Sequence, residues 1–208
     1  IGPDGYRALP ALVDGARRGE RSVFTDFDLE EHYEDVSPKR FDGVKAWIPV
    51  QRGCDYRCTY CIVPHTRGSE RSRKLADVVR ETNQVVEQGM TEVVLLGQTV
   101  NSYNDGEHDF ADLLRAVGAV AGIKRLRFTS PHPNDFSDRV IAALAEVPAV
   151  CEHVHLPMQS GSSEVLKRML RRYSRDEYFE CLARLRAAIP GLSVTTDVIV
   201  GFPSETDE

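Results

Sequence analysis

The stretch that decides the fold runs from Gly53 to Ile62 and reads GCDYRCTYCI, with thiols at Cys54, Cys58 and Cys61. It follows directly on the apolar segment 45–50, KAWIPV, which is typical of a buried strand. The C-x3-C-x2-C spacing allows one short loop to present three thiolates to a single soft metal centre. The sequence therefore predicts a metal site immediately after the first strand.

The number of thiolates indicates the kind of metal site. A structural zinc ion or an ordinary cubane cluster takes four protein ligands, whereas this loop supplies three cysteines. An iron–sulfur cluster held in this way keeps one iron open for a small chelating molecule. S-adenosylmethionine offers an amino and a carboxylate group for that purpose, so we expect an iron–sulfur cluster that binds this cofactor.

A zinc knuckle in a nucleic-acid-binding module is the alternative, with His65 as the fourth ligand. The spacing alone does not separate the two. Zinc modules are small, loop-rich units that depend on the metal to fold, and here a long series of strand and helix signals follows the cysteines. The odd number of cysteines, five, argues against a disulfide framework and favours a reducing, cytoplasmic compartment.

Composition and charge narrow the class of protein. The 208 residues are 41% hydrophobic and 28% charged, and the formal net charge of −6 argues against a uniformly basic nucleic-acid-binding surface. The charge is uneven: residues 26–35 hold six acids, and residues 165–175 hold five basic residues and no acid. We expect the chain to be an interior piece of a longer protein, with residues 1–42 forming a domain tail and linker and residues 43–208 a truncated core domain.

Strand and helix signals alternate after residue 43. Strands are expected at 45–50, 92–97, 125–130, 153–157 and 192–201, and helices at 75–88, 110–121, 137–147, 163–170 and from 174. Asp109 and Ser174 have the residue types and positions of N-caps, and Gly89 and Gly122 those of helix stops. Strands separated by single helices imply parallel pairing with right-handed crossovers. This pattern predicts an α/β fold, a complete or partial βα barrel, with a doubly wound open sheet as the alternative.

Each expected strand ends in polar or Gly/Pro-rich residues. In barrels of this kind the active site forms at the carboxyl ends of the strands. Gly, Pro, Asn and Ser also form ordinary turns, but the agreement of five loops favours a ligand at that end.

Several of these stretches together resemble the radical S-adenosylmethionine methylthiotransferases. The resemblance is carried by the cysteine loop with Tyr60, Pro64, Arg67 and Gly68, and by the stretches 97–103 (GQTVNSY), 130–133 (SPHP), 155–162 (HLPMQSGS) and 198–206 (VIVGFPSET). Within the family, the chain is most similar to the branch that adds a methylthio group to N6-isopentenyladenosine beside the anticodon of tRNA. Sibling branches act on threonylcarbamoyladenosine in tRNA or on an aspartate of a ribosomal protein.

The resemblance implies a cofactor set and a reaction. Cys54, Cys58 and Cys61 would hold a [4Fe-4S] cluster that binds S-adenosylmethionine, and a deoxyadenosyl radical would take hydrogen from C2 of the adenine. Sulfur would come through a second [4Fe-4S] cluster in the N-terminal domain, and electrons from a donor such as flavodoxin or ferredoxin. Because the second cluster's cysteines are not in this chain, the resemblance also implies that this piece alone cannot complete the reaction. Cys151 and Cys181 are expected to be small buried residues.

The candidate contacts to cofactor or substrate lie mainly in the cysteine loop and at the strand ends. Gln98 and Asn101 are candidates for the methionine end of the cofactor or the substrate, and Asp197 for the ribose hydroxyls. Arg172 matches a carboxylate bidentately. For each of these residues a structural role, in a turn, in loop packing or on a solvated helix face, remains the alternative. The cofactor-binding set is Tyr60, Ile62, Gln98, Asn101, Ser130, Gln159, Arg172 and Asp197.

Two further sets of residues are candidates for contact with the RNA. His132 lies between two prolines and is a candidate for substrate contact. The basic residues that follow the cysteine loop are candidates for tRNA phosphates; they are Arg67, Arg71, Arg73 and Lys74. No catalytic residue is assigned beyond the cluster ligands.

Overall fold

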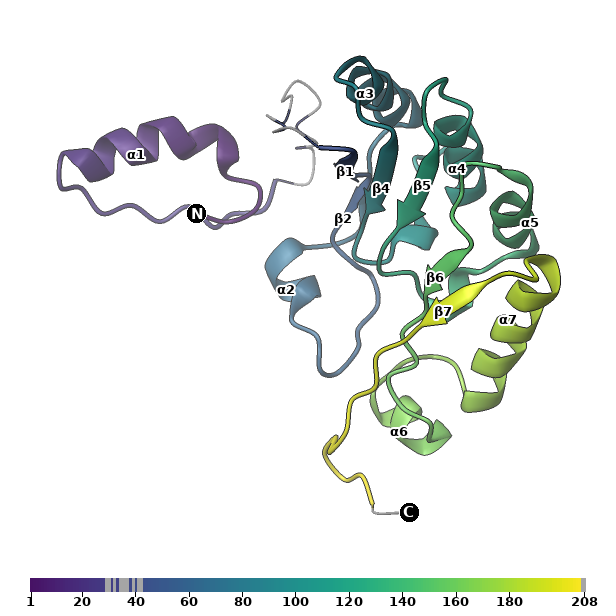
Figure 1. The fold of residues 1–208 in the computed structure, drawn as a ribbon. Coiled ribbons are helices and arrows are strands. Elements are labelled where there is room, and N and C mark those ends of the chain that lie inside the picture. Colours follow the sequence, from purple (N-terminus) through teal and green to yellow (C-terminus); the bar gives the residue numbers. More distant parts are fainter. Residues whose placement is uncertain (29–30, 32, 34–37, 39, 41–42, 207–208) are drawn as a thin grey trace.

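Parallel strands make up the centre of the molecule (Figure 1). The computed structural model describes residues 1–28, 31, 33, 38, 40 and 43–206. Strands β1 (Lys45–Pro49), β4 (Glu92–Leu96) and β5 (Arg125–Phe128) form one parallel sheet in the order β1-β4-β5. Strands β6 (His153–His155) and β7 (Ser193–Thr195) form a second parallel pair. Isolated bridges Leu126↔Val150 and Gln159↔Val198 continue the parallel arrangement between and beyond these strands.

The predicted α/β fold with a partial barrel is therefore confirmed. The strands curve as an open sheet rather than a closed barrel, and the elements alternate as the sequence indicated. β4 lies between two neighbours and is buried at four of its five residues, whereas β1 alternates, with Ile48 buried and Trp47 about half exposed. This difference is what a central strand and an edge strand require.

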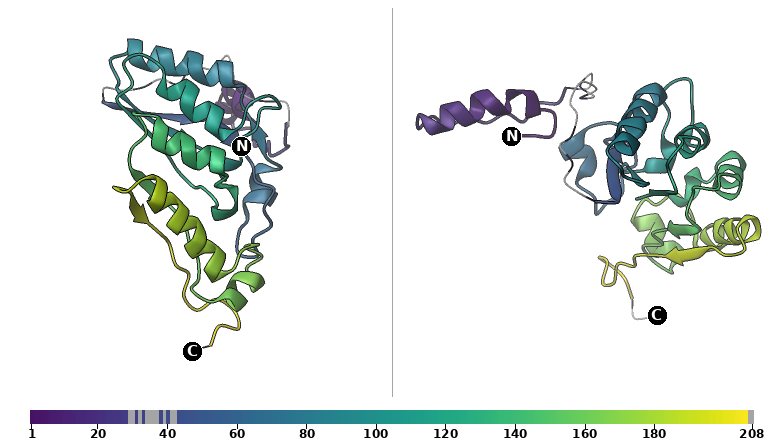
Figure 2. Two further views of the ribbon diagram at one scale, coloured as in Figure 1. Left: turned by 90° about the vertical axis from the view of Figure 1, so that its right-hand side faces the viewer. Right: turned by 45° about the horizontal axis from the view of Figure 1, so that its top comes forward.

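Helices cover one face of the strands (Figure 2). They are α3 (Leu75–Glu87), α4 (Phe110–Gly118), α5 (Asp138–Glu146) and α7 (Arg175–Ala188), with the short α6 (Ser163–Arg168) beyond β6. Asp109 and Ser174 each begin a helix as N-cap, as predicted, and both form a reciprocal capping box. Gly89 follows α3 with a φ of 85°, a conformation that glycine adopts without strain. Gly122 was expected to stop α4, which instead ends at Gly118.

The core lies between these helices and the strands. Leu113, Leu114 and Val117 of α4 are fully buried, and the ring of Phe110 meets that of Phe128 on β5 edge to face at a centroid distance of 5.3 Å. Burying each such side chain contributes about 1.5–3 kcal/mol. Cys181 is buried as expected, and Cys151 is partly buried. This packing fixes the strand ends from which the site is built.

The N-terminal segment lies to one side of this core. It contains a 3-10 turn (Tyr6–Ala8) and helix α1 (Leu9–Arg17), of which only Gly15 is buried. Leu9 and Val13 are exposed, and α1 extends away from the sheet (Figure 1). The division at residues 42 and 43 stays a prediction, because part of the linker, with three of the six acids of the acidic run, lies outside the described residues.

Two features of the fold were not predicted. Residues Gln51–Arg52 (β2) and Arg71–Ser72 (β3) pair as a small antiparallel ribbon, and Val63–Arg67 form the short helix α2. Strands of two residues carry no hydrophobic periodicity from which they could be recognised. The fifth strand was expected to span 192–201, but only Ser193–Thr195 are paired as a strand, and Val198 and Val200 are exposed.

Candidate functional site

All three cysteines of the loop line one cavity at the carboxyl ends of the strands. The cavity has a volume of about 260 Å³. The loop contributes Cys54, Tyr56, Cys58, Tyr60 and Cys61; the strand ends contribute Gln98, Thr99, Ser130, Pro131, His132, His155, Pro157, Gln159 and Asp197; Arg171 follows α6. The structure thus brings together residues from six separate stretches of sequence: the five that the barrel prediction required and the turn with Arg171.

The cysteine loop is closed at its base by backbone contacts. Gly53 has a φ of 71°, and a Cβ there would collide with the carbonyl oxygen of Ser69. The N–H of Cys54 donates to the carbonyl of Gly68 at 3.2 Å. Glycine is required here because of both the left-handed conformation and the close approach of the two chain segments.

The three thiols differ in their surroundings. Cys54 and Cys58 are almost fully buried and Cys61 is partly exposed. The sulfur of Cys54 lies 3.3 Å from the hydroxyl of Thr99, and burial is the main factor that raises the pKa of Cys54. A bound metal reverses that tendency, because it favours the thiolate.

The thiols are not gathered around a single ion. Among the described residues, no three His, Cys, Asp or Glu side chains lie close enough to hold one metal ion. Four sulfurs around zinc lie about 3.8 Å apart, because each Zn–S bond is about 2.3 Å long. A cluster of several irons spans more space than one ion, and the three thiols share a cavity of about 260 Å³.

A positive charge lies beside the second cysteine. Nη1 of Arg171 is 3.4 Å from Sγ of Cys58 and 3.4 Å from the hydroxyl of Tyr60, and Nε donates to the hydroxyl of Tyr173 at 3.0 Å. The Arg171 residue is 7% exposed. A guanidinium held in this way stabilises an anionic group in the cavity, whether a thiolate, a cluster or a carboxylate.

A stacked pair of rings forms another wall. The ring of Tyr56 lies on that of His132, with centroids 3.9 Å apart and planes at 16°. The hydroxyl of Tyr56 donates to the carboxylate of Asp135 at 3.0 Å. Nδ1 of His132 accepts from the N–H of Asn134, which places the ring proton on Nε2. Burial, together with Arg171 and Arg172, lowers the pKa of His132 to about 3, so the ring is neutral.

Polar groups at the strand ends complete the cavity. Ser130 and Gln159 have φ values of 56° and 69°, an uncommon conformation for residues other than glycine that clusters at functional sites. Oε1 of Gln98 is buried without a hydrogen-bond partner among the described residues. Asp197 is exposed and accepts from Nε2 of His155 at 3.1 Å. These groups can bind the hydroxyl, amino and carboxylate groups of a ligand.

Three of the predicted contact residues lie outside the lining of this cavity. Ile62 is 65% exposed and leads into α2. Asn101 is buried, and its amide group holds the backbone of His132 on both sides, at 2.7 and 2.9 Å. Arg172 does not line the cavity, and its guanidinium lies 5.6 Å from the centroid of the Tyr56 ring. Arg171 takes the place in the cavity that the sequence analysis gave to Arg172.

Sequence reasoning missed Tyr56, Thr99, His155 and Arg171 as lining residues. Tyr56 and Thr99 are neighbours of residues that were singled out, so position in the loops alone could have indicated them. No local signal distinguishes Arg171 from Arg172.

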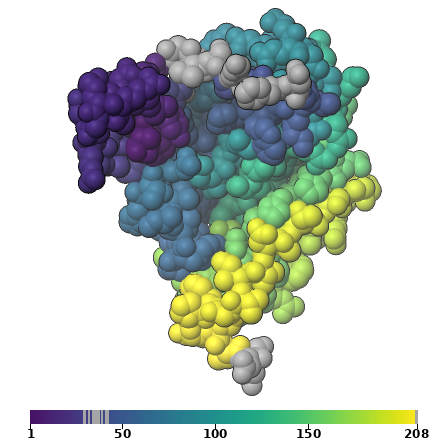
Figure 3. All heavy atoms as spheres, turned by 60° about the vertical axis from the view of Figure 1, so that its left-hand side comes forward, coloured from purple at the N-terminus to yellow at the C-terminus, as the bar shows by residue number. Residues whose placement is uncertain are grey.

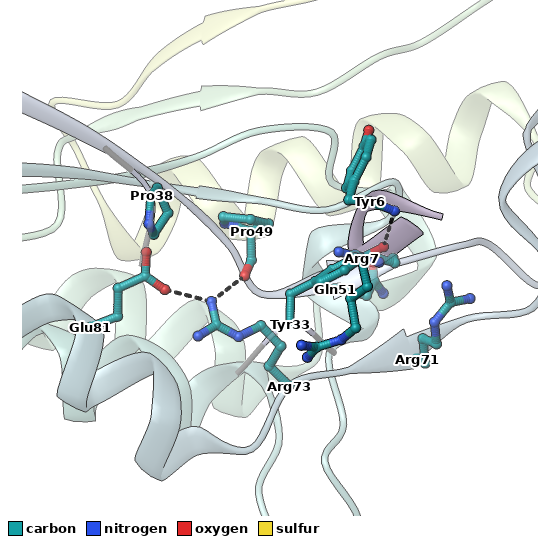
Figure 4. Close-up of a pocket in the computed structure, with 10 residues that line it drawn as sticks. Tyr6, Arg7, Tyr33, Pro38, Pro49, Gln51, Arg71, Arg73 and Glu81 are labelled. Atoms are coloured by element: carbon teal, nitrogen blue, oxygen red, sulfur yellow. Dashed lines mark hydrogen bonds and ion pairs between the residues drawn. The ribbon is translucent and has the colours of Figure 1, made fainter. Parts of the chain in front are cut away.

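Two further cavities lie beside the N-terminal segment. One of about 420 Å³ is lined by Tyr6, Tyr33, Arg71, Arg73 and Glu81, among others (Figure 4). It is larger than the cysteine cavity but contains no thiol, and Arg73 within it is paired with Glu81 at 2.6 Å. The other, of about 410 Å³, is lined by residues that include Pro3, Tyr6, Arg67 and Gln98. Since Gln98 also lines the cysteine cavity, the cavity of about 410 Å³ adjoins the cysteine cavity.

The class of protein follows from this fold and site. Residues 48–208 match the family model of the radical SAM superfamily, and the chain belongs to that superfamily. Membership implies a [4Fe-4S] cluster and S-adenosylmethionine, and three thiols around one cavity beside a buried guanidinium fit them. No described helix is long and apolar enough to cross a membrane.

Similar proteins narrow the class further. The chain is 52% identical over its whole length to a tRNA-2-methylthio-N(6)-dimethylallyladenosine synthase of Chlorobium phaeovibrioides, and 45% identical to one of Thermodesulfovibrio yellowstonii. It spans 47% and 48% of those proteins, about half their length.

Solved structures confirm the fold. The methyltransferase TsrM from Kitasatospora setae, with tryptophan and a SAM analogue bound, superposes with a TM-score of 0.70 at 20% identity, over 99% of this chain and 46% of that chain. SuiB from Streptococcus suis has a TM-score of 0.57 at 14% identity, over 96% of this chain and 46% of its own.

Proposed function

We propose that this chain is the radical SAM core of a tRNA methylthiotransferase that adds a methylthio group to C2 of N6-isopentenyladenosine next to the anticodon. The proposal is supported by relatives that match over the whole chain and are named as tRNA-2-methylthio-N(6)-dimethylallyladenosine synthases. The structural observation that carries it is the cavity in which three thiols meet the polar strand ends.

The residues of this cavity have distinct roles in the proposal. Cys54, Cys58 and Cys61 would hold the cluster, which together with S-adenosylmethionine would supply radical chemistry for hydrogen abstraction. Arg171 offers its positive charge to the cluster or to the cofactor carboxylate. The remaining cofactor contacts are assigned to the strand-end and loop residues Tyr60, Gln98, Ser130, Gln159 and Asp197.

The cavity walls also protect the reaction. On one side, the ring of His132 stacks on that of Tyr56 and meets that of Tyr173 edge to face at 5.4 Å. His132 cannot serve as a proton donor of ordinary strength, because its ring stays neutral and buried. Apolar faces of this kind exclude water and hold the two ligands in contact, which a radical reaction needs.

The target nucleoside is assigned to the adjoining cavity of about 410 Å³. Gln98 lies at the boundary of the two cavities, Tyr6 offers a ring for stacking on a base, and Arg67 offers a charge for a phosphate. Arg71 and Arg73 are engaged by Asp4 and Glu81, and Nζ of Lys74 donates to the carbonyl of Asp105. Arg67 is therefore the favoured phosphate contact of the four predicted.

The proposed reaction also needs a source of sulfur and a source of electrons, which we assign outside this chain. A second [4Fe-4S] cluster would donate sulfur, and flavodoxin or ferredoxin would supply electrons in a reducing cytoplasm. Because the curated relatives are about twice as long, the reaction is to be tested in the full-length protein.

The test is a nucleoside analysis of tRNA from cells that lack the full-length gene, complemented with the wild-type gene or with a Cys58→Ala variant. We expect 2-methylthio-N6-isopentenyladenosine to return with the wild type only. If the wild type instead restores a methylthio group on threonylcarbamoyladenosine, a sibling activity replaces the proposal.

A further inference from the structure

We infer that Asp4 is a positioning residue for the cysteine loop: its buried carboxylate closes the two-stranded neck from which the loop of Cys54, Cys58 and Cys61 extends. The importance of this neck for a cluster rests on the proposed function. The closure itself rests on contacts in the metal-free chain.

Asp4 lies between two arginines of that neck. Its side chain has 0% exposure, and it accepts from Nη1 of Arg52 at 3.1 Å and from Nη2 of Arg71. Arg52 on β2 and Arg71 on β3 are direct cross-strand partners. Like charges in opposite positions of an antiparallel pair repel each other, and the carboxylate of Asp4 offsets that repulsion.

The two arginines depend on this one carboxylate. Among the described residues, Asp4 is the only acid paired with either of them. The side chain of Arg71 is 8% exposed, and its Nε is buried without a partner in the described part of the chain. A buried cation that loses its counter-ion is strongly unfavourable, so the neck would open if the charge of Asp4 were removed.

The neck lies at the base of the loop that carries the site. Arg52 stands two residues before Cys54, and Arg71 closes the stretch 53–70. Nearer its tip, the loop is held by other contacts: the hydroxyl of Thr59 donates to the carbonyl of Arg168 at 3.1 Å, and the N–H of Thr59 donates to the carbonyl of Met169 at 3.2 Å. Asp4 therefore controls the base of the loop separately from its tip.

The N-terminal segment docks at this neck as a unit. The guanidinium of Arg52 lies 4.4 Å from the centroid of the Tyr33 ring, whose hydroxyl donates to the carbonyl of Pro3 at 3.2 Å. Figure 4 shows Tyr33 and Arg71 at this junction, and Figure 3 shows the purple N-terminal segment against the blue stretch that contains the loop. Docking of this segment and order in the cysteine loop are thus coupled through one carboxylate.

The experiment measures hydrogen exchange of the loop 53–70 by mass spectrometry in the metal-free, full 208-residue chain. Asp4→Asn keeps the size and the acceptor oxygen but removes the charge. We expect exchange in the loop to become about tenfold faster or more, with exchange in 75–118 unchanged. Asp14→Asn is the matched control, because Asp14 lies in the same segment in an exposed pair with Arg17.

A second variant separates charge neutralisation from a general loss of structure. In Asp4→Asn/Arg71→Gln, the repulsion across the neck is absent, so loop exchange is expected to return toward the wild-type rate. The inference is overturned if Asp4→Asn exchanges like Asp14→Asn, if exchange rises equally throughout the chain, or if the double variant shows no recovery.

The same variants can be reconstituted anaerobically with iron and sulfide. We expect the Asp4→Asn cluster to be lost to a chelator several-fold faster than the wild-type cluster. A wild-type chain that takes up no cluster contradicts the proposed function but leaves the exchange result standing, so the two failures are distinguishable.

Discussion

The guanidinium of Arg171 lies 3.4 Å from the sulfur of Cys58. A fixed positive charge at this distance favours the more negative form of whatever the thiolate binds, and burial strengthens the interaction. Arg171 is therefore placed to tune the redox behaviour of the site as well as to bind an anion.

Arg171→Ala is expected to lower the midpoint potential of the reconstituted cluster. The fall should be on the order of 50 mV, since 59 mV corresponds to a tenfold change for one electron. Arg171→Lys keeps the charge and should retain most of the potential. A redox titration followed by electron paramagnetic resonance checks this, and an unchanged potential in Arg171→Ala would mean that the charge does not act on the cluster.

Gly53→Ala is expected to destabilise the cysteine loop strongly. The new Cβ meets the carbonyl oxygen of Ser69, in addition to the strain of a φ of 71°. Gly89→Ala is the matched control, because Gly89 has a φ of 85° and open space around its Cβ position. Positive φ alone costs about 1 kcal/mol, so urea unfolding should show a clearly larger loss for Gly53→Ala. Equal losses of stability in the two variants would show that the close approach of the Ser69 carbonyl adds nothing to the cost at Gly53.

His132→Gln is expected to flatten the pH dependence of stability. The folded-state pKa of about 3 lies below the ordinary value of 6.5. The unfolded chain binds a proton in that window and the folded chain does not, so this contribution is complete above pH 6.5 and is lost as the pH falls toward 3. The loss approaches about 1.4 kcal/mol per pH unit. The urea midpoints at pH 7 and pH 5 should differ less in the variant than in the wild type. If stability changed with pH equally in both proteins, the ring would be protonated in the folded chain.

Tyr56→Phe is expected to weaken the fold by about 1–3 kcal/mol, because the partly buried carboxylate of Asp135 loses the hydroxyl that donates to it. Burial already raises the pKa of Asp135, and the Tyr56 hydroxyl opposes that rise. Because the folded-state pKa of Asp135 is raised, protonation of this carboxyl stabilises the fold below the ordinary value of 3.8, and that stabilisation is lost as the pH rises through the folded-state value. Above the folded-state value the carboxylate is ionised, and the Tyr56 hydroxyl stabilises that form. The deficit of Tyr56→Phe should therefore be larger at pH 7 than at pH 4.5; the reverse order would contradict the assignment.

Local signals in the sequence were sufficient for the regular elements. The capping box at Ser174 and the N-cap at Asp109 involve residues three positions apart, so the sequence alone reveals them. The cysteine loop after β1 and the polar strand ends followed from parallel topology, which brings all carboxyl ends to one edge.

Contacts between distant residues could not be predicted. The ribbon of β2 and β3 depends on Asp4, which is 48 and 67 positions away from its two arginine partners. The choice of Arg171 over Arg172 depends on the turn after α6, where Leu170 and Arg172 both have a φ of 57°. Neither a charge nor a turn of this kind is encoded in a local pattern.

The most direct test of the central claim is the metal content and spectrum of the chain after anaerobic reconstitution with iron and sulfide. The account predicts about four irons per chain, broad absorbance near 400 nm typical of cubane clusters, and a reduced-state resonance that S-adenosylmethionine shifts. Alanine at Cys54, Cys58 or Cys61 should abolish all three signals. A colourless chain that binds one zinc ion through the same thiols would contradict the account.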